Sequence, residues 1–228
     1  MHGSVAEWNE IVGDGAIPQA ELARLEGVRA RTLDLVADLS QEEMDRRPAR
    51  GGWSVGEVLD HLLKAEQANR SVIATLIELA RSGRRPYLRR ELTPRGLAPA
   101  FVPRSLLPLL SIPAGIATSF MPFCLRAALI RSRLFPASAA DEMWPRHGRP
   151  AGELRADLSR SVAETRRLFV AAPGLDYRRM IYQHPFLGAN DVPQILLLTA
   201  VHEERHQDQV RQLLAPAAGE ARRHLCAM

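Results

Sequence analysis

The stretch Ser54-Val-Gly-Glu-Val-Leu-Asp-His-Leu62 opens the longest periodic segment of the chain. Ser54 and Glu57 match the S-x-x-E capping box, in which serine and glutamate bond to free backbone amides at the start of a helix. Apolar side chains then recur at helical spacing as far as about Arg81. At 1.5 Å per residue, a helix of about 27 residues is roughly 40 Å long, which is typical of a helix in a bundle.

Three further segments show the same apolar period. They span residues 19–39, 151–171 and 191–214, and the last begins at Asp191, a favourable N-cap residue. Residues 40–52 are polar and are expected to form a loop, and the sequence shows no strand-like alternation of useful length. Four long amphipathic helices predict an all-α fold, a four-helix bundle.

Residues 83–150 interrupt this rhythm with many prolines and arginines. Within them, residues 105–125 form a run of 21 uncharged residues, which is long enough to cross a bilayer. Prolines break this run, and a proline inside a helix removes a hydrogen bond. We therefore expect an apolar helical insertion with one or two short helices between helices two and three. It would act as a buried hairpin, a lid, a dimer surface or a membrane-surface contact rather than a transmembrane span. Residues 1–228 then form a single domain that carries this insertion.

The composition is that of a soluble globular chain: among 228 residues there are 30 basic and 26 acidic side chains, for a net charge of +4. Basic residues often lie near acidic ones, as with Glu21 and Arg24, which favours a salt-bridged surface over a nucleic-acid site. The two cysteines, Cys124 and Cys226, match neither a disulfide framework nor a thiolate metal site. With no signal peptide in view, we expect a cytoplasmic protein without a nucleic-acid partner.

The segment His202-Glu-Glu-Arg-His206 carries two histidines at i and i+4, so both imidazoles lie on one face of a helix. That face is apolar and is expected to point into the bundle. The opposite face carries Glu204, Gln207, Asp208 and Arg211. His61 shares an apolar face of the second helix, while Asp60 and Lys64 are expected to point outward. Three inward histidines can hold a metal ion with an open position; the alternative is that each is a hydrogen-bonded core residue.

The same segment satisfies H-E-x-x-H, the zincin signature, in which the glutamate acts as general base. The extended pattern requires a glycine at position 209 and a histidine at position 212, but the chain has Gln209 and Gln212. No substrate-binding edge strand is evident either. A metallopeptidase is therefore the less favoured alternative.

Three stretches together resemble the DinB/YfiT-like metalloprotein superfamily. They are the Trp-Ser-x-x-Glu-x-x-x-His-Leu element at residues 53–62, the His-Pro-Phe-Leu-Gly sequence at 184–188, and the His-x-x-x-His pair at 202–206. The similarity covers about residues 20–80 and 150–215, and the middle of the chain departs from the compact form of the family.

This resemblance implies an up-down-down-up four-helix bundle with His61, His202 and His206 as metal ligands. It also implies a divalent metal, zinc or nickel, and a homodimer. The better understood branches of the family use low-molecular-weight thiols, as in bacillithiol and mycothiol transferases and a mycothiol-dependent maleylpyruvate isomerase.

The chemistry of such a site depends on its metal. An ion held by neutral imidazoles lowers the pKa of a bound water or binds a thiol as thiolate. Glu203 and Gln209 are the candidate catalytic groups beside it, although Glu203 could equally be a surface charge and Gln209 a core residue. We expect a metal-dependent thiol S-transferase or hydrolase acting on a small molecule. The alternative is a non-catalytic bundle that binds a metal or a small molecule.

Three other residues near these motifs have simpler interpretations. Glu57 is expected to serve the capping box, and Trp53 to pack as a structural anchor before the capped helix. His184 lies in a predicted loop, where it would contact substrate or stabilise a turn by a hydrogen bond.

Overall fold

The structure is a computed structural model of the full chain. It describes residues 17–49, 51–90, 98–99, 120–132, 137–138, 141–184 and 187–215. Most of the uncharged run at 105–125, and Cys226, lie outside these residues. Among the described helices, none is long and apolar enough to span a membrane.

The chain is mostly helical. In chain order the helices are α2 (Gln19–Leu35), α3 (Gln41–Asp45), α4 (Val55–Arg81), α6 (Phe123–Arg131), the 3-10 helix η2 (Asp141–Met143), α7 (Ala151–Val170) and α8 (Val192–Leu214). The strands are β1 (Tyr87–Arg89), β2 (Ala98–Pro99), β3 (Ala137–Ser138), β4 (Ile181–His184) and β5 (Gly188–Asp191).

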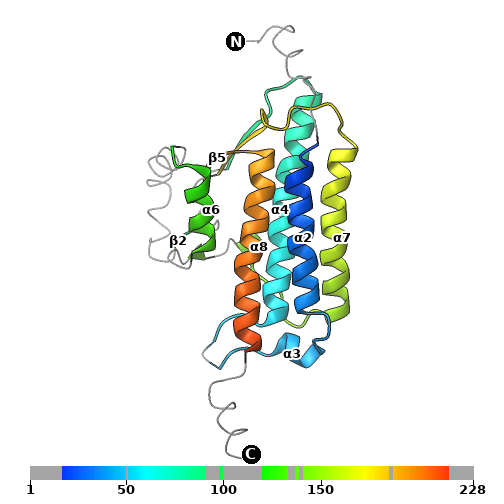
Figure 1. Cartoon of the computed structure of the whole chain (residues 1–228), viewed down its shortest axis with the longest axis vertical. Helices are drawn as coiled ribbons and strands as arrows, with labels where there is room; N and C mark the ends of the chain where they lie inside the picture. Colours follow the sequence, from blue (N-terminus) through cyan, green and yellow to red (C-terminus); the bar gives the residue numbers. More distant parts are fainter. Residues whose placement is uncertain are drawn as a thin grey trace, which may run out of the picture.

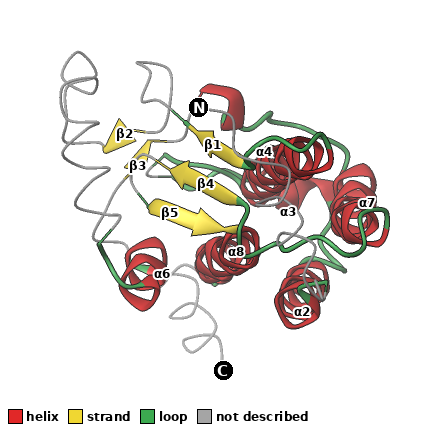
Figure 2. Cartoon of the chain, turned by 90° about the horizontal axis from the view of Figure 1, so that it is seen from above, coloured by secondary structure: helices red, strands yellow, loops and turns green. Residues whose placement is uncertain are grey.

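The four long helices form the predicted bundle. In Figure 1, α2 and α8 run from the top to the bottom, whereas α4 and α7 run from the bottom to the top. α2 packs along α8 and α7, and α4 packs along α7 and α8. Figure 2 shows these helices end-on, with the small sheet beside α4 and α8. The up-down-down-up arrangement expected from the resemblance is therefore present.

The helix starts follow the local sequence closely. The Ser54 hydroxyl accepts a hydrogen bond from the Glu57 amide at 3.2 Å, and the Glu57 carboxylate accepts one from the Ser54 amide at 2.9 Å. Asp191 caps α8 in the same way together with Gln194. The prediction of a plain loop over residues 40–52 is wrong, because Ser40 forms a third capping box and starts the short helix α3. Its S-x-x-E spacing is the same as that at Ser54, so this helix start was visible in the sequence.

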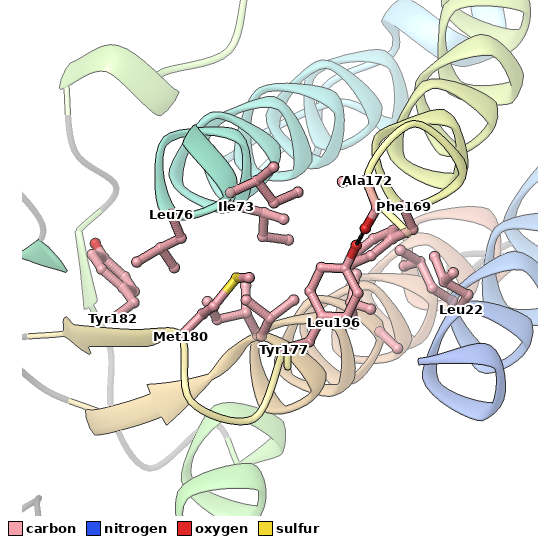
Figure 3. Close-up of a cluster of buried hydrophobic side chains, with 14 of the residues drawn as sticks. Leu22, Ile73, Leu76, Phe169, Ala172, Tyr177, Met180, Tyr182 and Leu196 are labelled. Carbon is pink, nitrogen blue, oxygen red and sulfur yellow. Dashed lines mark hydrogen bonds between the residues drawn. The ribbon is translucent and has the colours of Figure 1, made fainter. Parts of the chain in front are cut away.

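The apolar core consists of two clusters along the bundle. The cluster at the sheet end is shown in Figure 3, where the Tyr177 hydroxyl donates to the Ala172 carbonyl at 2.6 Å. The second cluster, at the α3 end, includes Met44, Val58 and Leu158. The first cluster takes buried residues from all four long helices, and the second takes them from α4, α7 and α8. Burial of these apolar side chains stabilises the bundle.

A small sheet was not expected from the sequence. β4 and β5 form an antiparallel hairpin in which Tyr182 pairs with Asn190, and β1 adds to β4 in parallel. These strands have three or four residues, which is too short for an alternating pattern to stand out. Because β5 ends at the N-cap of α8, the hairpin positions the start of the helix that carries two of the histidines.

The described part of the insertion contains the expected short helices, α6 and η2. α6 packs along α8, as Figure 1 shows. The guanidinium of Arg126 is buried and donates to the carbonyls of Leu187 and Ala189 and to the side chain of Asn190. A wholly surface role for the arginines is therefore wrong, since this one ties α6 to the β4–β5 hairpin.

Candidate metal centre

Three histidine side chains meet between α4 and α8. His61 lies in the second turn of α4, and His202 and His206 lie one turn apart on α8. The Nε2 atom of His202 is 3.4 Å from that of His61 and 3.2 Å from that of His206. Each residue offers one nitrogen to a group whose atoms all lie within 4.8 Å of one another, so the group could hold a metal ion. The sequence therefore predicted this meeting correctly.

Hydrogen bonds on the far nitrogens orient two of these rings. His61 Nδ1 lies 3.0 Å from the carbonyl oxygen of Met143, and His206 Nδ1 lies 2.8 Å from Oε1 of Gln209. Both oxygens can only accept, so each Nδ1 carries the proton and each Nε2 presents a lone pair. This is the tautomer that a metal-binding imidazole needs.

The surroundings keep all three imidazoles neutral. Burial, with a smaller contribution from Arg205, lowers the pKa of His61. Burial and the two neighbouring histidines lower the pKa of His202 well below its ordinary value. Burial and His61 lower the pKa of His206 to about 3. Protons therefore do not compete for these nitrogens near neutral pH.

The two nitrogen separations at His202 fit a tetrahedral ion. Two nitrogens bound to one tetrahedral zinc at about 2.0–2.1 Å lie roughly 3.3–3.4 Å apart. The separations of 3.4 and 3.2 Å at His202 are close to this value. Because His61 and His206 carry their protons on Nδ1, their Nε2 atoms can only accept. A proton on His202 Nε2 could be donated to one of these two atoms but not to both. A cation shared by the three nitrogens removes the remaining repulsion between lone pairs, so the donor set fits a metal.

Asp60, the residue before His61, forms a buried charged cluster with three basic residues. Asp60 is fully buried, and its carboxylate accepts from the Arg146 amide at 2.8 Å and from the Arg149 guanidinium at 2.9 Å. Lys64 lies 3.0 Å from Asp60 and donates to the Trp144 carbonyl at 2.6 Å. Burial raises the pKa of Asp60, but these donors outweigh it and lower the pKa below its ordinary value.

The expectation that Asp60 points to solvent is therefore wrong, because the returning end of the insertion covers this face of α4. The partner of His61 is a backbone carbonyl far away in sequence, which leaves no trace in residue type. Only the i, i+4 spacing of Asp60 and Lys64 hinted at a local ion pair.

Glu203 lies away from the histidines. Its carboxylate forms a two-point contact with Arg29 at 2.8 and 2.9 Å and accepts from Thr32 at 2.6 Å. Arg29 also donates to Glu66 at 2.8 Å, and all four side chains are buried. The interpretation of Glu203 as a surface charge is therefore wrong. The structure brings Gln209 to the histidine group and directs Glu203 toward α2, on a different face of α8.

Gln207, expected on the solvent face of α8, is also buried. Its amide donates to the Val28 carbonyl at 2.8 Å and to the Thr32 hydroxyl at 2.9 Å. α2 packs against the face of α8 that carries Gln207, so this polar face is a contact between two helices. The sequence pattern alone gave no sign of it.

The remaining candidates have structural contacts. Glu57 caps α4, as its sequence position predicted, and also accepts a hydrogen bond from Arg47. His184 ends β4, and its Nδ1 accepts a hydrogen bond from the Leu187 amide at 3.1 Å, which is the turn-stabilising bond considered above. The ring of Trp53 packs 4.8 Å from the ring of His61, between centroids.

Comparison with known proteins gives one finding. The chain matches the family model described as the DinB superfamily over residues 24–210. Neither the curated proteins nor the solved structures gave a match.

Proposed function

The chain belongs to the DinB superfamily, and from this premise we propose that it is a metal-dependent thiol S-transferase acting on a small electrophilic molecule. Zinc or nickel at His61, His202 and His206 is part of the proposal, as is a low-molecular-weight thiol as second substrate. The homodimer implied by the resemblance stays a prediction, to be tested by the molecular mass in solution.

The observation that carries the proposal is the composition of the site. The group of side chains that could hold the ion consists of three histidines and no carboxylate among the described residues. Glu203, the general base that a peptidase of the H-E-x-x-H type would require, is engaged by Arg29 and Thr32. Attack by water benefits from such a base, whereas a thiol bound to a cation loses its proton without one.

The proposed reaction transfers a thiol sulfur to an electrophilic carbon. His61, His202 and His206 would hold a divalent ion through neutral imidazoles, and the ion would supply the positive charge that stabilises a thiolate at neutral pH. Overall, the thiol sulfur forms a bond to an electrophilic carbon, the leaving group departs with its bonding electron pair, and the thiol proton is released to solvent. The protein positions the imidazoles through Met143 and Gln209.

The test is turnover of the purified protein loaded with Zn²⁺ or Ni²⁺. We expect thioether formation from a panel of small thiols with 1-chloro-2,4-dinitrobenzene, and its loss in His202→Ala. Glu204→Gln, a change at a partly exposed neighbour that lies outside the histidine group, is the matched control and should remain active.

Two results would contradict the proposal. Metal-loaded protein without turnover for any thiol would support the non-catalytic binding bundle instead. Hydrolysis of the same electrophile without any thiol would assign the protein to the hydrolases.

A further inference from the structure

Met143, whose carbonyl accepts the hydrogen bond from His61 Nδ1, ends the short helix η2. The residues that follow it, 144–150, form neither a helix nor a strand. Their conformation is therefore not fixed by the backbone hydrogen bonds of a regular element. Other contacts must hold the Met143 carbonyl at the place where it orients the ring of His61.

Asp60 makes the central one of these contacts. Its side chain is fully buried, and its carboxylate accepts from the backbone amide of Arg146 at 2.8 Å and from the guanidinium of Arg149 at 2.9 Å. Arg146 follows Met143 by three residues, so the carboxylate holds the chain just after the carbonyl that meets His61. Charge-assisted hydrogen bonds of this kind are about twice as strong as neutral ones.

Lys64 adds a further contact to the same segment. Its ammonium lies 3.0 Å from the Asp60 carboxylate and donates to the Trp144 carbonyl at 2.6 Å. Asp60, His61 and Lys64 lie on adjacent turns of α4. The part of the helix that carries the imidazole therefore also holds the backbone that faces this imidazole.

We propose that Asp60 is a positioning residue for the metal centre. It holds the Met143 carbonyl against Nδ1 of His61, which keeps the Nε2 lone pair of that ring directed to the point shared with the other two histidines. Asp60 acts through the backbone of residues 143–146 rather than by contact with the ion. The inference rests on the metal-binding part of the proposed function, and it adds that the returning end of the insertion sets the affinity of the site.

The experiment measures the affinity of the full chain for Zn²⁺ and Ni²⁺ by competition with a chromophoric chelator. Asp60→Ala removes the acceptor for the Arg146 amide, and we expect roughly tenfold weaker binding, the lower end of what losing a partner of a metal-bound histidine typically costs. Asp60→Asn keeps a side-chain oxygen for that amide but loses the charge, so it should recover part of the affinity. Lys64→Met, at a partly exposed position, should weaken binding by a smaller factor.

A second measurement separates the positioning of His61 from a general effect on stability. In the metal-free protein, ¹⁵N NMR of the imidazoles reports which ring nitrogen carries the proton. In Asp60→Ala we expect His61 to lose part of its Nδ1-protonated form, whereas His206, which is held by Gln209, should keep this form. A merely structural role of Asp60 would leave both rings unchanged or disturb both.

Two variants serve as matched controls. Asp157→Asn breaks the ion pair with Arg149, which uses the guanidinium nitrogen that does not donate to Asp60, and it leaves the Arg146 amide bonded. Ile73→Val removes a buried methyl group from the other half of α4, which lowers stability away from this segment. Both variants should bind metal within about twofold of the wild-type protein, as expected for independent sites.

The outcomes separate this inference from the proposed function. Wild-type protein that binds neither Zn²⁺ nor Ni²⁺ would overturn both. Wild-type protein that binds metal, with the same affinity and the same His61 tautomer in folded Asp60→Ala, would overturn the inference alone. Weaker metal binding in Asp60→Ala of a protein without thiol turnover would support the inference while the proposed chemistry fails.

Two further results would overturn the inference. The first is an unchanged affinity in both Asp60→Asn and Lys64→Met, which decides the matter if Asp60→Ala folds poorly. The second is a loss of affinity in Ile73→Val equal to that in Asp60→Ala, because stability rather than the position of His61 would then control the site.

Discussion

His202 and Glu203 are neighbours in the chain, yet their side chains enter two different polar clusters on different faces of α8. The histidine cluster, formed with His61 and His206, presents lone pairs to one point and contains no counter-charge. The Arg29 cluster is formed by Arg29, Thr32, Glu66, Thr165 and Glu203. In it, donors and acceptors are matched to one another. The direction of a side chain, rather than its place in a short sequence motif, therefore decides whether it can take part in binding or catalysis.

The two clusters also have different structural roles. The Arg29 cluster joins side chains of all four long helices. It lies between the two apolar clusters of the core, since Val28 of α2 belongs to one and Val36, just after α2, belongs to the other. Through Glu203, the Arg29 cluster fixes the rotation of α8 about its own axis. This rotation directs His202, the preceding residue, toward α4. Among the long helices, the histidine cluster joins only α4 and α8.

The largest expected effect comes from Arg29→Met. Removing the cation leaves the carboxylates of Glu66 and Glu203 buried without a partner, which typically costs about 3–5 kcal/mol. Urea unfolding at neutral pH measures it. Arg166→Met breaks a two-point Arg–Glu contact with Glu26 at the surface, and its effect should be much smaller. If Arg29→Met and Arg166→Met lowered the free energy of unfolding equally, the proposed difference between the buried cluster and the surface pair would be wrong.

A smaller effect, on metal affinity rather than stability, is expected from Gln209→Ala. Without its oxygen, the tautomer and orientation of His206 are no longer fixed, and loss of such a partner typically weakens metal binding about 10- to 100-fold. Competition with a chromophoric chelator measures the affinity. The exposed Gln67→Ala is the control on α4, and an unchanged affinity in Gln209→Ala would show that the hydrogen bond has no influence on the site.

The smallest effect concerns the capped end of α4. Burial raises the pKa of Glu57, but hydrogen bonds from Arg47 and from the Ser54 amide outweigh it and lower the pKa below its ordinary value. A lowered pKa in the folded state means that this carboxylate stabilises the protein above about pH 4.5. The contribution is lost as the pH falls through the folded-state pKa. The free energy of unfolding, measured between pH 3 and 7, should therefore depend less strongly on pH in Glu57→Gln than in the wild-type protein. An identical pH dependence in the two proteins would contradict this assignment.

Much of this arrangement was readable from residue patterns. The capping box at Ser54, the N-cap at Asp191 and the long apolar periods predicted the helices of the bundle, because these signals are local. The i, i+4 histidines and His61 predicted the histidine group that could hold a metal, because helical geometry fixes which face they occupy.

The remainder depends on contacts between distant segments. The buried Asp60, Gln207 and Glu203 look like surface residues until α2 and the returning insertion are packed against their helices. The Met143 carbonyl that orients His61 has no signature at all, since every residue has a carbonyl. The strands of the sheet were too short for their alternation to be recognised.

The most direct test of the account is the metal content of purified chains that differ at the two neighbouring residues. We predict about one divalent ion per chain in the wild-type protein and in Glu203→Gln, and its loss in His202→Ala. Thr32→Val, which weakens the same cluster as Glu203→Gln, should also keep the ion and serves if that variant folds poorly. Full metal retention in His202→Ala would contradict the separation of the two clusters, and loss of metal in folded Glu203→Gln alongside it would contradict that separation further.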